Sequence, residues 1–152
     1  MNPLNAEISR VANLTPYNEY QSLVGVYRLL GSALGVNLNS LNLDNAIALS
    51  LVPGVAAGAA FYKALAITLN NASTSLTTAQ VAVYTGLGAT GTNLVAAQAV
   101  STLAASTNDL ALTLAAGATT NVLTSNTLYL RNTTAQGSTA TADVYVWGWV
   151  YP

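Results

Sequence analysis

The chain has 152 residues, and only four Lys or Arg and five Asp or Glu are charged, for a formal net charge of -1. Its length is typical of one domain, but its charged fraction of 6% is far below the roughly 25% of ordinary soluble domains. Four cations cannot neutralise a row of phosphates, which argues against nucleic-acid binding. The absence of His and Cys excludes thiolate, imidazole and Ser-His-Asp chemistry, zinc and iron-sulfur sites, and disulfides.

No segment is typical of a membrane protein or a signal peptide. The first ten residues lack a cationic stretch followed by an apolar one. The uncharged run over residues 45–62 is near the lower length limit of a span, and Pro53-Gly54 interrupts it. We therefore expect no membrane partner. A hydrophobic fraction of 52% also argues against disorder, so the chain is expected to fold.

The first part of the chain, residues 1–59, is interpreted as a helical or extended N-terminal segment. Asn2-Pro3 resembles a helix start, and a short helix is expected to end before Pro16. A second helix is predicted from Asn18, with apolar residues at helical spacing up to Leu34 and a stop at Gly35. Gly25 and Gly31 weaken this helix, which leaves a strand-like segment as the alternative. Residues 36–44 are expected to form an extended loop.

Residues 60–152 differ in composition and predict β structure. Only three of the chain's charged residues lie after Lys63, while Thr becomes frequent from Thr68 onward. Short apolar runs alternate with turns rich in Gly, Asn and Thr, and no intervening helix separates them. The runs, together with one just before residue 60, cover residues 45–52, 61–69, 79–85, 94–102, 110–115, 127–133 and 141–151. This number of strands predicts an antiparallel β-sandwich, specifically a jelly roll.

The last predicted strand is apolar on both faces. Alternation places Tyr145, Trp147, Trp149 and Tyr151 on one face, and Val144, Val146, Gly148 and Val150 on the other. Because a sandwich strand needs one face for its core, the other face should meet the N-terminal segment, a second subunit or a ligand. Trp and Tyr are favoured at protein interfaces, and they also stack on sugar rings. The choice between core, interface and sugar platform stays open from the sequence.

Other features that resemble functional motifs have simpler interpretations. The glycines of residues 86–91 are followed by neither the Lys nor the helix of a phosphate-binding loop, so we expect a turn. Asp109 is expected to close a turn and Asp143 to lie at a strand entrance, and no carboxylate cluster predicts a metal site or an acid-base pair. Arg131 is interpreted as a surface or interface residue. We expect no enzymatic activity, no cofactor and no metal.

The charge-poor sandwich with a distinct N-terminal segment resembles the capsid decoration (cement) proteins of tailed bacteriophages, which have jelly-roll domains. The resemblance is carried by AVYTGLGATGTNLVAAQAV and LYLRNTTAQGSTATADVYVWGWVYP. It implies a structural virion protein, made in the host cytoplasm and placed on the outer capsid surface, where a homotrimer binds and stabilises the major capsid protein shell. The alternative is a fibre-type or lectin-like module that binds a receptor or carbohydrate.

A near-neutral surface with a second apolar β-face also favours self-association, because little charge repulsion opposes it. We therefore expect a homo-oligomer, most simply a trimer. The residues expected at an interface combine the apolar stripe of the N-terminal segment, the isolated Arg and the aromatic strand: Tyr20, Leu23, Tyr27, Arg131, Tyr145, Trp147, Trp149 and Tyr151.

Overall fold

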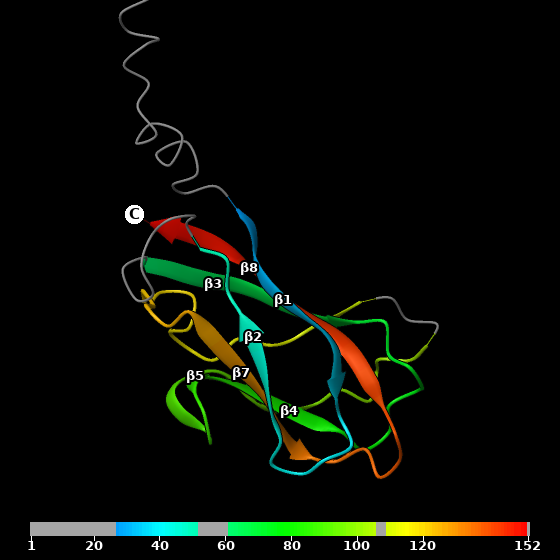
Figure 1. Ribbon diagram of the computed structural model, residues 1–152. Helices are drawn as coiled ribbons and strands as arrows, with labels where there is room; N and C mark the ends of the chain where they lie inside the picture. Colours follow the sequence, from blue (N-terminus) through cyan, green and yellow to red (C-terminus); the bar gives the residue numbers. More distant parts are fainter. Residues whose placement is uncertain (1–26, 52–60, 106–108, 152) are drawn as a thin grey trace, which may run out of the picture.

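The computed structural model describes residues 27–51, 61–105 and 109–151. Within these ranges the chain forms eight β-strands and no helix (Figure 1), so none of this part offers a helix that could span a membrane. In chain order the strands are β1 (Arg28–Asn37), β2 (Asp44–Ala48), β3 (Phe61–Asn70), β4 (Gln80–Gly86), β5 (Thr90–Ala99), β6 (Leu110–Ala111), β7 (Thr127–Thr134) and β8 (Thr141–Tyr151).

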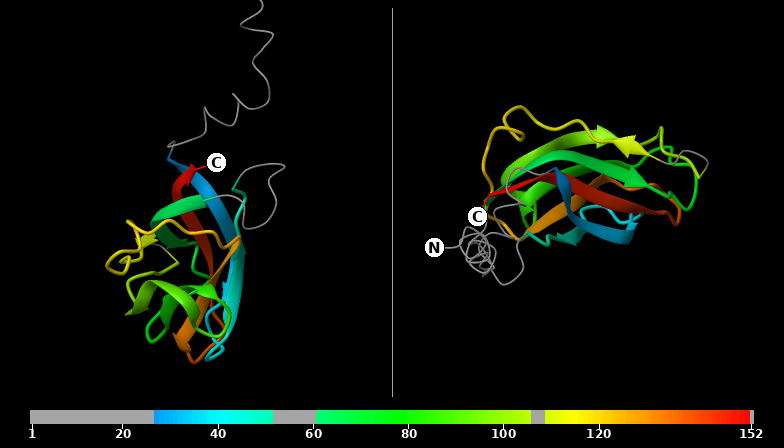
Figure 2. Two further views of the ribbon diagram at one scale, coloured as in Figure 1. Left: turned by 90° about the vertical axis from the view of Figure 1, so that its left-hand side faces the viewer. Right: turned by 90° about the horizontal axis from the view of Figure 1, so that it is seen from above.

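The strands form two four-stranded antiparallel sheets that pack face to face as two layers (Figure 2). One sheet has the order β1-β8-β3-β6 and the other β2-β7-β4-β5. The first strand therefore pairs with the last, the second with the second-last, and so on inward to β4 and β5. A long hairpin rolled into two sheets gives this order, which is that of a jelly roll. The predicted antiparallel sandwich and its jelly-roll topology are confirmed.

The core is clearest on β7 and β8, where buried apolar residues alternate with outward polar or aromatic ones. On β8, Ala142, Val144, Val146 and Val150 are buried between the sheets. Leu128 and Leu130 of β7 face them from the opposite sheet, since they too are fully buried at alternate positions. A buried Val or Leu stabilises the fold by about 1.5–3 kcal/mol relative to an exposed one. The Val face of β8 is therefore the core face.

Both open sides of the sandwich are closed by backbone hydrogen bonds between the sheets. On one side Gly31 and Leu49 form a β-bridge, and the Ser50 amide donates to the Leu30 carbonyl at 2.7 Å. On the other side the segment after β6 crosses between the layers. Its Leu112 amide donates to Ile67 of β3 and its Ala115 amide to Leu94 of β5, both at 2.8 Å. Pairing at the edges removes backbone groups that would otherwise invite association with other chains.

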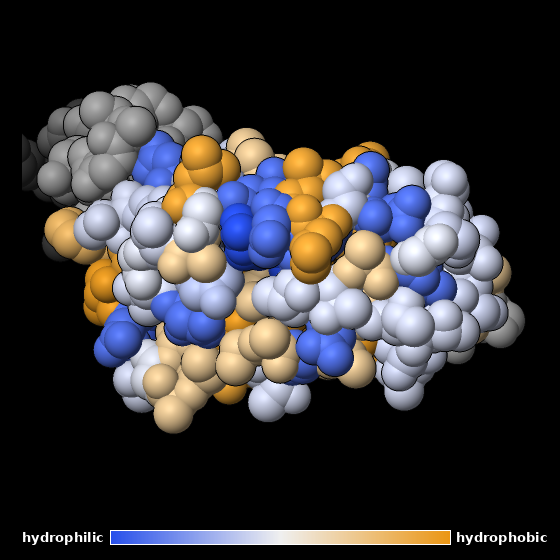
Figure 3. Space-filling view, turned by 90° about the horizontal axis from the view of Figure 1, so that it is seen from below, coloured by the Kyte–Doolittle hydropathy of each residue, from blue (hydrophilic) through white to orange (hydrophobic). Residues whose placement is uncertain are grey.

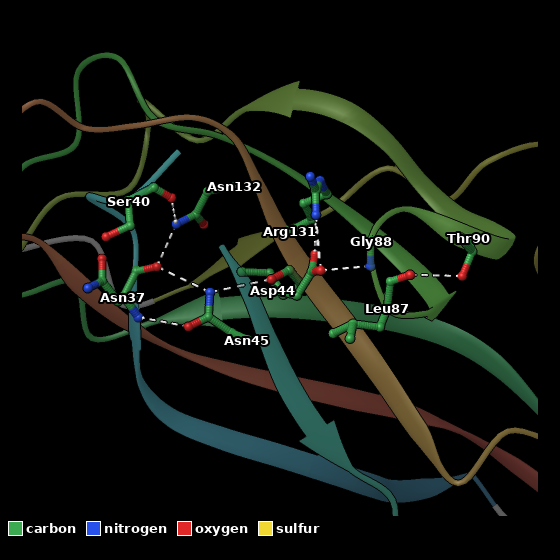
Figure 4. Close-up of polar contacts among 10 residues, drawn as sticks. Asn37, Ser40, Asp44, Asn45, Leu87, Gly88, Thr90, Arg131 and Asn132 are labelled. Atoms are coloured by element: carbon green, nitrogen blue, oxygen red, sulfur yellow. Dashed lines mark hydrogen bonds and ion pairs between the residues drawn. The ribbon is translucent and has the colours of Figure 1, made fainter. Parts of the chain in front are cut away.

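Asparagine side chains hold the loop between β1 and β2, as Figure 4 shows. The buried Asn132 of β7 donates from Nδ2 to the carbonyls of Asn37 at 2.7 Å and Ser40 at 2.9 Å. Asn45 of β2 accepts from the Asn37 amide at 3.1 Å through its Oδ1. These two strand side chains thus satisfy backbone groups of the loop and its start that the sheets leave unpaired.

The described residues correct the interpretation of the N-terminal part. The helix predicted from Asn18 to Leu34 is wrong where the structure describes it, because residues 28–37 form strand β1. The spacing of the apolar residues was compatible with the period of a helix and with that of a strand. Pairing with β8 selects the strand. The sandwich consequently begins before residue 60, since β1 and β2 each belong to one of its sheets. The helix expected before Pro16 lies outside the described residues.

Among the strands after residue 60, two differ from the predicted limits by more than one residue. The strand expected over 94–102 is β5, which starts earlier, at Thr90, because it pairs with β4 directly through the turn at residues 87–89. The strand expected over 110–115 is reduced to Leu110–Ala111, since the following residues leave β3 to reach β5. The last strand, 141–151, has the predicted limits.

Candidate interaction face on the β1-β8-β3-β6 sheet

The aromatic residues of β8 lie on the outer face of the β1-β8-β3-β6 sheet. Tyr145, Trp147 and Tyr151 are partly buried and Trp149 is exposed, whereas the intervening Val144, Val146 and Val150 are buried in the core. Of the three locations that the sequence left open, the sandwich core is therefore excluded. An interface or a ligand platform remains.

The end of this face near the C-terminus is apolar. Figure 1 shows the start of β1 and the end of β8 beside each other at this end of the sandwich. Phe61 of β3 is in register with Tyr151, Lys63 with Trp149, and Leu29 of β1 with Trp147. Four large side chains here are substantially exposed: Tyr27 (52%), Leu29 (40%), Phe61 (45%) and Trp149 (37%). These four residues are called the apolar end below.

Tyr27 also makes the one aromatic contact found in the described part of the chain. Its ring stacks on that of Trp147, with centroids 6.0 Å apart and planes inclined by 12°. Offset stacking at this distance is favourable by about 0.5–1.5 kcal/mol beyond the area that it buries. The contact ties the residue just before β1 to the middle of β8. Trp147 therefore marks the boundary between the apolar end and the rest of the face.

The other half of the same face is polar and contains an open hollow of about 350 Å³. Thr68 and Asn70 of β3, Asp109 just before β6, and Tyr145 and Trp147 of β8 line it. The register explains the grouping, since Thr68 lies opposite Tyr145 in β8 and Ala111 in β6. Strands β8 and β3 and the residue before β6 thus bring two aromatic rings together with a hydroxyl, an amide and a carboxylate.

The polar groups around the hollow differ in how far the fold already uses them. The Asp143 carboxylate accepts hydrogen bonds from the Gly35 amide and from Asn71 Nδ2, both at 2.8 Å. It therefore anchors β1 and the β3–β4 loop at the entrance of β8, where the sequence placed it. Asn70 Oδ1 is buried and has no hydrogen-bond partner among the described residues. Asp109 is exposed.

The structure brings five of the expected interface residues together and separates one. Tyr27, Tyr145, Trp147, Trp149 and Tyr151 share the outer face described above. Arg131 lies on β7 in the opposite sheet, so it does not join them. Tyr20 and Leu23 lie outside the described residues.

Arg131 has an internal partner. Its guanidinium forms an ion pair with Asp44 of β2 at 2.9 Å, and the two side chains are 18% and 9% exposed. The same carboxylate accepts a hydrogen bond from the Gly88 amide at 2.7 Å (Figure 4). The glycine-rich segment 86–91 is thus the turn between β4 and β5, as predicted, and Asp44 binds one of its amides. The pair joins β2, β7 and this turn.

The view from below the molecule, on the side of the β2-β7-β4-β5 sheet, has a different character (Figure 3). Hydrophobic residues there form small groups separated by strongly and weakly polar ones. Outward residues of this sheet include Tyr129, Arg131 and Thr133 of β7, which alternate with buried ones. Mixed surfaces of this kind are ordinary for a folded protein. The β1-β8-β3-β6 sheet is therefore the better candidate for a functional face.

The sequence analysis missed four residues of that face: Leu29, Phe61, Thr68 and Asn70. A signal was present in FYKALAITLN, where Tyr62, Ala64, Ile67 and Leu69 are buried and the remaining residues face outward. Alternation alone fails here because a register shift between Ala64 and Ala66 moves the outward positions by one. Only pairing with β8 shows where this irregularity lies.

Within the described ranges no three or more Asp or Glu residues gather where they could hold a metal ion. Comparisons of the chain with protein-family models, curated proteins and solved structures find no match. The chemistry of the candidate face is therefore the basis for a functional proposal.

Proposed function

We propose that this protein is a structural virion protein, a capsid decoration protein that assembles as a trimer on the outer surface of a major capsid shell and stabilises it. Its role in this proposal is non-enzymatic and needs no cofactor. The resemblance in sequence character motivates the proposal, and a jelly-roll sandwich is compatible with it. The occupant that we assign to the apolar end is a second copy of this chain.

The observation that carries the proposal is the apolar end of the β1-β8-β3-β6 sheet. The inner face of that sheet already lines the core, so Tyr27, Leu29, Phe61 and Trp149 are not needed there. Aromatic residues at the centre of an apolar patch are the residues that most often dominate binding energy. Lys63 is in register with Trp149, and Arg28 stands between Tyr27 and Leu29 in the sequence. These are the only charged residues of β1 and β3, so copies of the chain would meet with limited charge repulsion.

Light scattering coupled to size exclusion tests the assembly. The wild-type chain should elute with three times the 15.5 kDa mass of one chain. Trp149→Ala should shift the equilibrium toward monomer, because a buried interface Trp commonly contributes about 2 kcal/mol or more. The β-sheet circular dichroism spectrum should stay unchanged, since this side chain lies outside the core.

Leu87→Ala is the matched control, because Leu87 is 62% exposed at the β4–β5 turn, which belongs to the other sheet. It should leave the mass unchanged. A wild-type chain that is monomeric at high concentration would contradict the oligomer. Binding of the wild-type protein to purified phage shells, reduced in Trp149→Ala, tests the shell partner separately.

A further inference from the structure

We propose that the hollow on the β1-β8-β3-β6 sheet binds one neutral sugar ring. This inference goes beyond the assembly role, since it uses the polar half of the face and assembly uses the apolar end. The hollow's volume of about 350 Å³ lies at the small end of the roughly 300–1,000 Å³ of ligand sites. It suits a single monosaccharide or one residue of a longer glycan.

The aromatic residues provide a surface for the apolar face of the ring. Tyr145 and Trp147 come from the same side of β8, two residues apart, and both line the hollow. A pyranose presents C–H groups on its flat face, and these pack on an aromatic ring as other apolar groups do. Trp147 is additionally held by its stacking on Tyr27, which restricts the orientation of the indole. A pre-oriented ring loses less entropy on binding.

The polar residues match the hydroxyl groups at the edge of the ring. Asp109 contributes a carboxylate that can accept two hydrogen bonds, Thr68 a hydroxyl, and Asn70 an amide that both donates and accepts. Asn70 Oδ1 is unpaired in the described structure, and an unpaired buried oxygen costs free energy. A ligand hydroxyl that donates to it would recover that cost. Asp143 does not line the hollow, and its two carboxylate oxygens already accept from the Gly35 amide and Asn71 Nδ2.

The charges select against other small ligands. Asp109 is the one charged residue of the lining, and no Lys or Arg of the described chain lines the hollow. Acidic sugars and phosphates would therefore be repelled. A quaternary ammonium would be attracted by a carboxylate and aromatic rings. Its ammonium group has no N–H to donate to Thr68 or Asn70, whereas a neutral polyol has enough hydroxyl groups for all three polar residues.

Tryptophan fluorescence of the full chain tests the site. The protein has two Trp residues, so a Trp149→Phe background leaves Trp147 as the single reporter. The probes are glucose, galactose, mannose and N-acetylglucosamine, with glucuronate as the acidic probe and choline chloride as the cationic one. At least one neutral sugar should cause a saturable change in the Trp147 emission, whereas glucuronate and choline should not.

Variants in that background locate the site. Asn70→Ala and Asp109→Ala should each weaken binding at least about tenfold, the effect of losing a hydrogen bond to a buried or charged group. Asn121→Ala, at an exposed Asn outside the hollow, should bind as the background does. Light scattering of the same variants should show the oligomeric state of the background. A loss of sugar binding is thereby separated from a failure of the assembly proposal.

Three results would overturn the inference: no saturable change with any neutral sugar at tens of millimolar, equal affinities in the background and both hollow variants, or tighter binding of choline or glucuronate than of every neutral sugar.

Discussion

Tyr62 is the largest fully buried side chain in the described core, and its hydroxyl has no hydrogen-bond partner there. Tyr62 lies on the inward face of β3, one residue before Lys63, and is in register with Val150 of β8. Burial raises the pKa of the Tyr62 hydroxyl well above its ordinary value of 10.0. The hydroxyl thus contributes volume to the core but no bond, and this has two consequences for stability.

Tyr62→Phe should leave the fold equally stable or up to about 1 kcal/mol more stable at neutral pH, because it removes an unpaired buried polar group without opening a cavity. Tyr62→Ala should cost about 3–5 kcal/mol through the cavity that it leaves. Urea denaturation measures both. A loss of more than about 1 kcal/mol in Tyr62→Phe would mean that the hydroxyl is hydrogen-bonded after all.

The raised pKa also gives this residue a pH dependence. Above about pH 10 the Tyr62 hydroxyl ionises in the unfolded chain but stays protonated in the folded one, so the unfolded state binds fewer protons and stability falls as pH rises. The stability advantage of Tyr62→Phe over wild type should therefore be constant below pH 10 and grow above it. Denaturation curves of the two proteins at neutral and alkaline pH check this, and parallel curves throughout would contradict it.

Among the elements, β8 organises the molecule. It lies between β1 and β3, supplies Val144, Val146 and Val150 to the core, and carries the aromatic residues outward. Its one glycine, Gly148, lies where β3 comes unusually close. A Cβ there would collide with the Lys63 carbonyl oxygen and contact Leu30 Cδ1 at 3.0 Å. The glycine between Trp147 and Trp149 is thus a packing requirement of the sheet.

Gly148→Ala should destabilise the protein by about 1–3 kcal/mol, because the methyl group meets backbone that cannot move without breaking the ladder between β3 and β8. Gly137→Asn is a suitable control. Gly137 has a φ of 84°, and no atom lies within 4 Å of the position that a Cβ would take there; Asn also tolerates positive φ better than other side chains. Thermal unfolding compares the stability of these two variants with that of the wild type. Equal stability of Gly148→Ala and wild type would refute the close approach.

At the scale of the whole molecule, the jelly roll is assembled from pairs that are distant in the sequence. β1 pairs with β8, and its neighbour β2 pairs with β7, so the ends of the described chain hold each other in place. The composition change near residue 60 suggested that the sandwich starts there. The structure places Leu30, Val36 and Leu38 in the same core as the later strands.

A chain that begins at Leu41 should therefore fail to form the sandwich. It lacks β1 and three buried apolar side chains, which together contribute roughly 5–9 kcal/mol at about 1.5–3 kcal/mol each. That is comparable with the whole stability of about 5–15 kcal/mol typical of a domain. A chain that begins at Tyr27 keeps all eight strands and is the control. Circular dichroism with a cooperative thermal transition in the shorter chain would contradict this expectation.

Local information in the sequence was enough for the class of fold and for the approximate limits of most strands after residue 60. Strict alternation over 141–151 and turn residues at regular spacing predict the strands, because a half-buried strand needs period two and its turns need Gly or Asn. The same alternation identified the aromatic face of β8. It could not say whether that face is inside or outside, since both faces of the strand are apolar.

The tertiary structure decided the features that depend on which strands pair and in which register. The stretch 28–37 satisfies helical and strand spacing alike, and only its hydrogen bonds to β8 select the strand. Thr68 and Asn70 do not stand out in the sequence, because Thr and Asn are frequent in it, and Asp109 was interpreted there only as a turn residue. They line one hollow with Tyr145 and Trp147 because β3 lies between β8 and β6 in the sheet. Arg131 was separated from the aromatic residues for the same reason, since β7 belongs to the other sheet.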